Sequence, residues 1–168
     1  NEDAQGLTIL AGIYQEIHET ENVPEYFQKS KDVLEKAVKL DPNDAVAHSM
    51  LADVLSQIGD KQGAIREQKE AVRLNPKNLN SLTTLGVWQH NANDVSAARK
   101  TYEEVLKINP NYIYALLRYG LLENEAGNVD NAKRLFIRAT DAPRTEQLDE
   151  SFAKRAKAEL QKMDGEIK

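Results

Sequence analysis

The residues that could do chemistry most directly in this sequence are three histidines. His18, His48 and His90 lie tens of residues apart, and none has a second ligand at the spacing of a zinc site. The stretch 90–94, His-Asn-Ala-Asn-Asp, offers nitrogen and oxygen atoms that could hold a cation. Its Asn-Asp pair is explained equally well as a turn, because both residue types favour turns and helix starts. We therefore expect no metal site.

Other catalytic patterns are also missing from the sequence. The chain has no cysteine, no Gly-rich phosphate loop and no serine in a nucleophile elbow. Its carboxylates alternate with basic residues at helical spacing, as Glu70 does with Arg73 and Glu103 with Lys107. This spacing is typical of a solvated helix face with intrahelical ion pairs. We expect no catalytic residue and no cofactor, and hence no enzyme.

The elements that would position any functional residue are set by a repeat. Asp-Pro or Asn-Pro recurs at 41–42, 75–76 and 109–110, which gives two intervals of 34 residues, and Pro143 follows after 33 more. A fixed period of this length indicates an array of identical structural repeats. Proline ends a helix, because it lacks an N–H group and restricts the residue before it.

Small residues and turns recur inside the same frame. Each repeat reads as two helices of about a dozen residues joined by a Gly, Asn or Asp turn, such as Gly59-Asp60. Close helix crossings need small side chains on both helices. The aligned small residues are Ala52, Gly86 and Gly120 on the first helices and Ala64, Ala98 and Ala132 on the second helices.

The 34-residue period, the Leu85-Gly86 pair, the spacing of Ala98 before Tyr102 and the closing proline resemble the tetratricopeptide repeat (TPR) family. The resemblance implies an all-α fold, a right-handed α-solenoid of about four TPR helix-turn-helix repeats plus a C-terminal capping helix. We expect a single TPR domain over residues 1–168. Its repeats are expected at about 4–44 (irregular), 45–78, 79–112 and 113–146, with the capping helix at about 146–163.

Both ends of the array depart from the repeat. In the first repeat, the stretch from His18 to Phe27 is either a longer turn or an extended helix with a kink at Pro24. After Pro143, Leu148, Phe152, Ala156, Leu160 and Met163 fall on one helical face. An array must cover its last apolar face, so we interpret this segment as a cap, with a partner-binding amphipathic helix as the alternative.

The family resemblance also implies where a partner would bind, because the first helices of TPR repeats line a concave groove. The candidate partner-binding residues are Met50, Asp53, Asn80, Thr84, Val87, His90, Asn91, Tyr114, Leu117, Arg118, Leu121 and Asn124. A carboxylate clamp of the kind found in chaperone-binding relatives is not expected, since only Arg118 has the required chemistry.

The predicted groove is mostly neutral, with an apolar end at Tyr114, Leu117 and Leu121, and suits a peptide with apolar anchors. The alternative is that Leu117 and Leu121 pack under a neighbouring helix or the cap. The most direct functional hypothesis is a non-catalytic scaffold that binds a peptide or protein segment in this groove. A self-associating structural or assembly module and an accessory TPR domain of a larger protein or enzyme are the alternatives.

Composition limits the class of partner. Net charge is −5 and charges of both signs are interleaved, so nucleic acid is not an expected partner. No apolar run approaches the length of a membrane span, and we expect no direct membrane insertion. Partners are expected to be proteins or peptides, with a homo-oligomer possible. The compartment stays open: cytoplasmic, or periplasmic if Asn1 follows a removed signal peptide.

Overall fold

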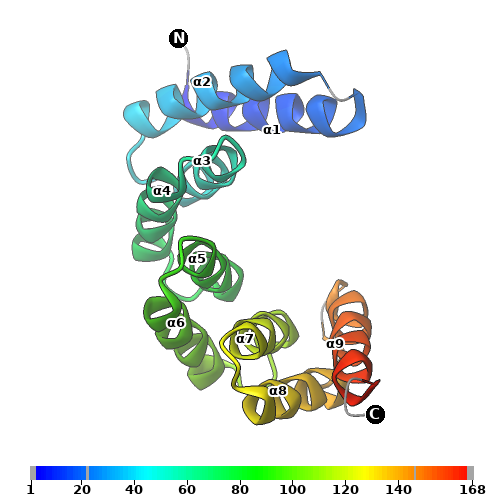
Figure 1. The fold of residues 1–168 in the computed structure, drawn as a ribbon. Coiled ribbons are helices and arrows are strands. Elements are labelled where there is room, and N and C mark those ends of the chain that lie inside the picture. The colour runs from blue at the N-terminus through cyan, green and yellow to red at the C-terminus, as the bar shows by residue number, and fades with distance from the viewer. Residues whose placement is uncertain (1–2, 22, 146, 166–168) are drawn as a thin grey trace. The chain divides into compact units, whose positions relative to one another are not determined.

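The computed structural model describes residues 3–21, 23–145 and 147–165, apart from the side chain at 164, and within these residues every regular element is a helix. The helices follow one another along the chain in Figure 1. Their bounds are α1 Ala4–Glu21, α2 Pro24–Leu40, α3 Ala45–Gln57, α4 Lys61–Leu74, α5 Leu79–Asn91, α6 Val95–Ile108, α7 Ile113–Glu125, α8 Val129–Asp141 and α9 Asp149–Gly165. None of these helices is long and apolar enough to span a bilayer.

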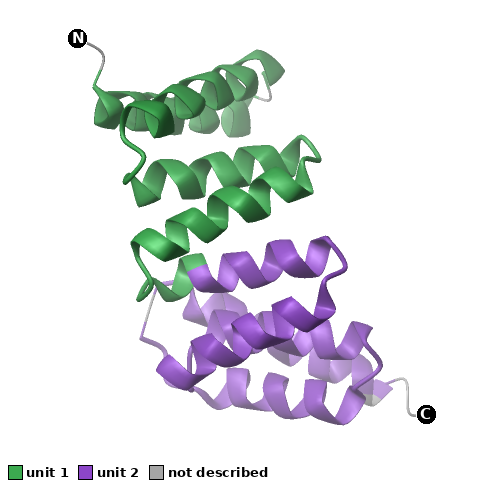
Figure 2. Ribbon diagram, turned by 90° about the vertical axis from the view of Figure 1, so that its left-hand side faces the viewer, with its two compact units in different colours: residues 1–81 green, residues 82–168 purple. Residues whose placement is uncertain are grey.

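The chain forms two compact units, shown in different colours in Figure 2. Unit 1 comprises residues 1–81, from α1 to the first residues of α5. Unit 2 comprises residues 82–168 and contains the rest of α5 and helices α6 to α9. The predicted single domain stays a prediction.

Small residues bring the helices of unit 1 together. Ser30 and Ala11 are fully buried between α2 and α1, and the Ser30 hydroxyl donates a hydrogen bond to the Ala11 carbonyl at 3.1 Å. Ala52 on α3 and Ala64 on α4 are likewise buried. The first helix, α1, runs to Glu21 and a separate helix, α2, begins at Pro24, so the helices of the first repeat are longer than those of the other repeats and Pro24 lies at a helix start. Residue 22 lies outside the described residues.

In unit 2 the small residues of the first helices lie against aromatic rings of the second helices. A Cβ atom added at Gly86 on α5 would lie 2.5 Å from Cε1 of Tyr102 on α6. A Cβ atom added at Gly120 on α7 would lie equally close, 2.5 Å, to Cε1 of Phe136 on α8. Real Cβ atoms do not approach so closely, so only glycine allows these two crossings.

The turns inside the repeats use Gly, Asn and Asp residues as predicted, to end one helix and to cap the next. Gly59 and Gly127 have φ of 89° and 80°, and Asn93 has φ of 63°, the left-handed region that ends a helix. The Asp60 side chain accepts a hydrogen bond from the Gly63 amide, and Asp94 accepts one from the Ala97 amide. These carboxylates cap the second helices of their repeats.

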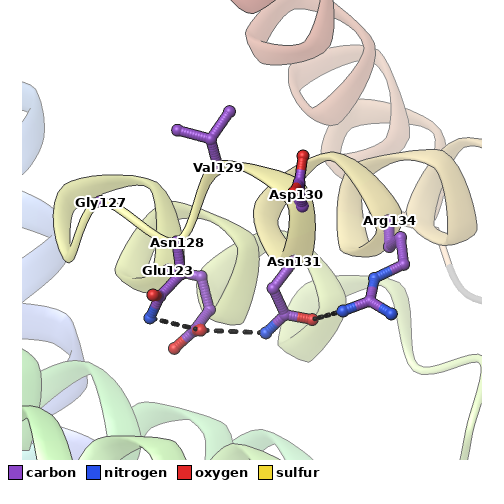
Figure 3. Close-up of a pocket in the computed structure, with 7 residues that line it drawn as sticks. All are labelled: Glu123, Gly127, Asn128, Val129, Asp130, Asn131 and Arg134. Carbon is purple, nitrogen blue, oxygen red and sulfur yellow. Dashed lines mark hydrogen bonds between the residues drawn. The ribbon is translucent and has the colours of Figure 1, made fainter.

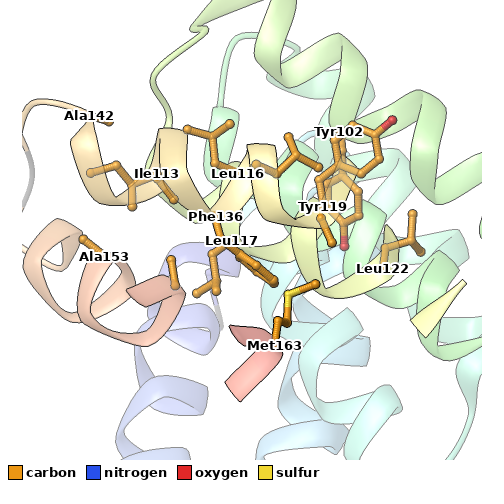
Figure 4. Packing of buried hydrophobic residues seen from close by; sticks show 14 of the residues in the cluster. Tyr102, Ile113, Leu116, Leu117, Tyr119, Leu122, Phe136, Ala142, Ala153 and Met163 are labelled. Atoms are coloured by element: carbon orange, nitrogen blue, oxygen red, sulfur yellow. The ribbon is translucent and has the colours of Figure 1, made fainter. Parts of the chain in front are cut away.

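The last helix, α9, packs on α7 and α8. Ala153, Ala156 and Met163 belong to the buried apolar cluster of unit 2, and Phe152 and Leu160 pack against that cluster. Figure 4 shows Met163 beside Leu117 and Phe136. The helix begins at Asp149 rather than near 146, a residue that lies outside the described residues. It covers the apolar side of the last repeat, as a cap would.

Candidate functional site

The first helices of unit 1, α1 and α3, present an apolar face. Ile9, Ile13 and Val46 are 66%, 47% and 60% exposed. Ile9 and Val46 line one surface cavity of about 540 Å³. Gly12 lies opposite Met50, whose Cε is 3.6 Å from the position of a Cβ atom added at Gly12. Single exposed aliphatic side chains are ordinary, but a group of them on one surface indicates an interaction site.

The same face carries an acidic side chain, Asp53, one helical turn after Met50 on α3. Its side chain is half-buried, and burial raises the pKa of Asp53 to about 6. No hydrogen-bond or ion-pair partner for it is found among the described residues. A partly desolvated carboxylate without a partner is stabilised by a nearby cation. We call this surface the unit 1 face and define it by Ile9, Gly12, Ile13, Val46, Met50 and Asp53.

Asp44 fixes α3 against α1 at one end of the unit 1 face. Its Oδ1 atom caps α3 by accepting from the amides of Val46 and Ala47 at 2.9 and 3.0 Å. Its Oδ2 atom accepts a hydrogen bond of 2.9 Å from the Thr8 hydroxyl on α1. The start of α3 is thereby held beside residue 8 of α1, which positions Ile9 next to Val46.

The α1 side of this face was not identified from the sequence. Ile9, Gly12 and Ile13 fall in the first repeat, which does not follow the 34-residue frame. A signal was nonetheless present. Ile9 and Ile13 are one turn apart, on the side of α1 opposite the buried Leu7 and Ala11.

The predicted groove residues of unit 1 are all accessible. Met50 is half-buried and, with Asp53, lies on the unit 1 face. Asn80 is exposed in the first turn of α5. Whether these residues bind a partner stays a prediction.

In unit 2, the predicted apolar end of the groove is covered by α9. The Tyr114 ring on α7 stacks on the Phe152 ring of α9, with centroids 4.8 Å apart and planes inclined by 22°. Leu117 is only 1% exposed and lies within the core cluster (Figure 4). Leu117 as a partner-contacting residue is therefore corrected: the alternative of packing under the cap is what the structure shows. Leu121 is half-buried and packs against the same cluster.

The other predicted residues of unit 2 lie at its first helices with mixed accessibility. Thr84 and Val87 on α5 are half-buried, and Asn91 is exposed at the end of that helix. Asn124 on α7 is exposed as well. His90 has its Nε2 atom 3.1 Å from a carboxylate oxygen of Glu125, so α5 and α7 meet through this polar pair.

Arg118 is the predicted groove residue closest to the covered end. It is half-buried, with its guanidinium carbon 5.4 Å from the centroid of the Tyr114 ring. The cation over the ring face continues the stack that Tyr114 makes with Phe152. Arg118 thus contributes to the packing of α7 beneath α9, and one arginine in this setting is no carboxylate clamp.

A polar cavity of about 410 Å³ surrounds Glu123 at the turn between α7 and α8 (Figure 3). Glu123 is only 3% exposed and accepts hydrogen bonds from Arg99, Asn128 and Asn131 at 2.8, 3.0 and 2.9 Å. Burial opposes its ionisation, but the Asn131 and Arg99 hydrogen bonds outweigh this and hold the pKa of Glu123 below its ordinary value. The donors that bind this carboxylate belong to α6, α8 and the turn before α8, so it joins the helices of unit 2.

The histidines noted in the sequence take part in local packing. His18 Nδ1 lies 3.1 Å from the Val23 carbonyl oxygen. His48 is buried, with Nδ1 2.8 Å from Glu67 Oε2 and Nε2 3.2 Å from the Pro42 carbonyl oxygen. Across the described part of the chain, no three His, Asp or Glu side chains are grouped so as to hold a metal ion.

Comparison with known proteins identifies the repeat. Family models described as tetratricopeptide repeat match residues 33–66 and 91–144. No curated protein sequence matches the chain. Two crystal structures of MamA are 26% identical to it over 80% of this chain, covering 75% and 70% of theirs, with TM-scores of 0.71 and 0.70.

A third solved structure, YrrB, is described as a TPR protein with an unusual peptide-binding site. It is 18% identical, covers 96% of this chain and 80% of its own, and has a TM-score of 0.67, which shows a shared fold. The predicted fold class, an all-α helical repeat solenoid, is thus confirmed together with the helices described above. The chain belongs to the tetratricopeptide repeat family.

Proposed function

We propose that the chain is a non-catalytic protein-interaction scaffold that binds a segment of a partner protein on the exposed face of its first helices. TPR repeats support an interaction role at the level of the family. The location of the binding surface is supported by the unit 1 face, where Ile9, Ile13 and Val46 are all about half exposed or more on adjoining helices. Their burial by a partner would remove apolar surface from water.

The packing of α9 in unit 2 supports the same proposal. This amphipathic helix lies on α7, which is a first helix, with Phe152 on the Tyr114 ring and Met163 in the core. The first-helix side of a repeat in this chain can therefore accept another helix through apolar and aromatic contacts. In unit 1, the corresponding sides of α1 and α3 carry exposed aliphatic side chains instead.

The proposal is consistent with what is known of one neighbour. YrrB is described as having a peptide-binding site, and its 18% identity ties it to this chain through the fold alone. The location of the site on this chain therefore depends on its own surface, and the unit 1 face is the surface we assign.

Affinity capture with a matched pair of variants tests this function. Ile13→Glu combined with Val46→Glu places two charges on the unit 1 face and should abolish capture of the bound protein from a native lysate. Leu40→Glu is the control, because Leu40 is 56% exposed on α2 and lies outside the unit 1 face. Circular dichroism should show equal helicity for all proteins, since the changed side chains are exposed. Capture that survives in the double variant would contradict the proposal.

A further inference from the structure

The acidic and basic residues of the chain are unevenly distributed. Residues 1–81, which form unit 1, contain 14 Asp and Glu residues and 9 Lys and Arg residues. Residues 82–168, which form unit 2, contain 13 of each kind. The whole formal net charge of −5 therefore belongs to unit 1.

Within unit 1 the acidic and basic residues are separated further, because all the basic residues lie outside the first helices, α1 and α3. Neither α1 nor α3 contains a Lys or Arg residue. The nine basic residues lie on α2, on α4 and in the turn after α4, at Lys29, Lys31, Lys36, Lys39, Lys61, Arg66, Lys69, Arg73 and Lys77. The surface formed by α1 and α3 consequently carries carboxylates without basic residues of its own.

Carboxylates on the second helices are neutralised locally, in contrast to those of the first helices. On α2, Lys31 Nζ lies 2.5 Å from a Glu35 oxygen, and on α4, Arg73 Nη2 lies 2.6 Å from a Glu70 oxygen. On α3, Asp53 has no such partner among the described residues, and its burial raises its pKa. The first helices thus leave negative charge to be matched from outside the chain.

The unit 1 face is continued on α1 by a second carboxylate, Glu16, one helical turn after Gly12. Thr8 bonds to Asp44 at the start of α3, and Gly12 faces Met50 one and a half turns further along α3. The two helices therefore run in the same direction. Glu16, which is exposed, follows Gly12 by one helical turn, as Asp53 follows Met50 by one turn on α3. Along both helices the apolar residues Ile9, Ile13 and Val46 are thus followed by a carboxylate, Glu16 on α1 and Asp53 on α3.

We infer that the unit 1 face binds an amphipathic α-helix whose apolar side chains cover Ile9, Ile13 and Val46 and whose Lys or Arg residues reach Asp53 and Glu16. This inference rests on the proposed function and adds the chemistry of the partner. The exposed isoleucine and valine side chains require apolar contacts, and the carboxylates select a basic rather than an acidic segment.

The packing of α9 supports a helical partner. That helix carries Lys154, Arg155, Lys157 and Lys162 on a segment whose apolar residues pack on α7 and α8. It is an example, within this molecule, of an amphipathic helix lying on a first helix, although it also carries acidic residues such as Asp149, Glu150 and Glu159. A partner helix that carried Lys or Arg beside its apolar side would meet no basic residue on α1 or α3.

Two synthetic peptides test the inference by fluorescence anisotropy. The first is a 16-residue helical peptide with leucine along one face and lysine at the remaining positions. The second has every lysine replaced by glutamate. The lysine peptide should bind about tenfold or more tightly than its twin at low salt, and its affinity should fall as salt is added, because charge attraction is screened.

Three variants of the full chain show whether binding uses this face. Asp53→Asn should weaken binding of the lysine peptide about three- to tenfold, and Glu16→Gln with Asp53→Asn should weaken it further and reduce its salt dependence. Glu35→Gln is the control, since it removes one exposed carboxylate from α2. Equal weakening by the control, or none by the Asp53 and Glu16 changes, would overturn the inference.

The outcomes separate this inference from the proposed function. If the lysine and glutamate peptides bind alike while Ile13→Glu with Val46→Glu still abolishes capture of the natural partner, the basic-helix inference fails and the proposed function stands. If capture is unaffected by that double variant, the proposed function fails. If sedimentation shows a dimer of this chain that the double variant dissociates, a second copy occupies the face and the inference is overturned.

Discussion

Asp53 is a residue of unit 1 at which burial disfavours the charged form of a carboxylate. Burial raises the pKa of Asp53 to about 6 from its ordinary value of 3.8, so the folded state holds its proton more tightly than the unfolded chain does. Between these values the folded state binds more protons, and stability falls as pH rises toward 6. The contribution of Asp53 to the free energy of unfolding should therefore be lower at pH 7.5 than at pH 4.5, by about 2 kcal/mol.

Urea titrations at the two pH values, monitored by circular dichroism, measure this difference. Asp53→Asn removes the ionisable group, so it should lose the Asp53 part of the pH dependence and be more stable than the parent chain at pH 7.5. The control is Asp32→Asn, a change at an exposed carboxylate on α2. A parent chain and an Asp53→Asn variant with identical pH profiles would show that Asp53 is well solvated.

Gly120 is a second residue whose role follows from its surroundings. A Cβ atom there would lie 2.5 Å from the Phe136 ring, so Gly120→Ala forces α7 away from α8 and should lower the free energy of unfolding by about 1–3 kcal/mol. Gly12→Ala is the matched control in another first helix, because its Cβ atom would lie 3.6 Å from Met50, an ordinary contact. Gly12→Ala should be neutral or stabilising, since alanine favours a helix. Equal destabilisation by both would contradict this account.

At the scale of helices, the repeat in the sequence predicted the turns and helix crossings that recur in each repeat. It did not predict contacts that occur only once, such as the packing of α9. The turns and close crossings follow from residues such as Asn93 and Gly86, which recur at fixed intervals and act through local geometry. The accessibility of Leu117 depends on where α9 packs, and no period in the sequence determines that contact. The α1 part of the unit 1 face was missed for the related reason that α1 is 18 residues long and lies outside the frame.

The contact between α9 and α7 gives a prediction at this scale. Phe152→Ala removes the ring that stacks on Tyr114, and we expect a loss of about 2 kcal/mol, because a half-buried aromatic ring contributes less than a core one. Hydrogen exchange measured by mass spectrometry should become faster in α7 and α9. Ser151→Ala, an exposed neighbour on α9, should change neither. Unchanged exchange in α7 in the Phe152 variant would mean that α9 does not protect it.

At the scale of the whole molecule, each compact unit contains its own buried residues. The cluster around Tyr102 and Phe136 is drawn entirely from unit 2, whereas Leu34 is fully buried within unit 1. The stability of a repeat array is approximately the sum of the stabilities of its repeats and of the contacts between neighbouring repeats. A substitution that removes packing in one unit should therefore cause the helices of that unit to unfold first. This expectation can be tested with one large buried residue in each unit.

Phe136→Ala should cost about 3–5 kcal/mol and Leu34→Ala about 2–5 kcal/mol, since both side chains are fully buried. With hydrogen exchange followed at increasing urea, the Phe136 variant should lose protection first in α7 and α8, while α2 and α3 stay protected. The Leu34 variant should show the reverse order, and each protein serves as the control for the other. If both variants lost protection in all helices at one urea concentration, the chain would unfold as one cooperative body and its units would not be independent in stability.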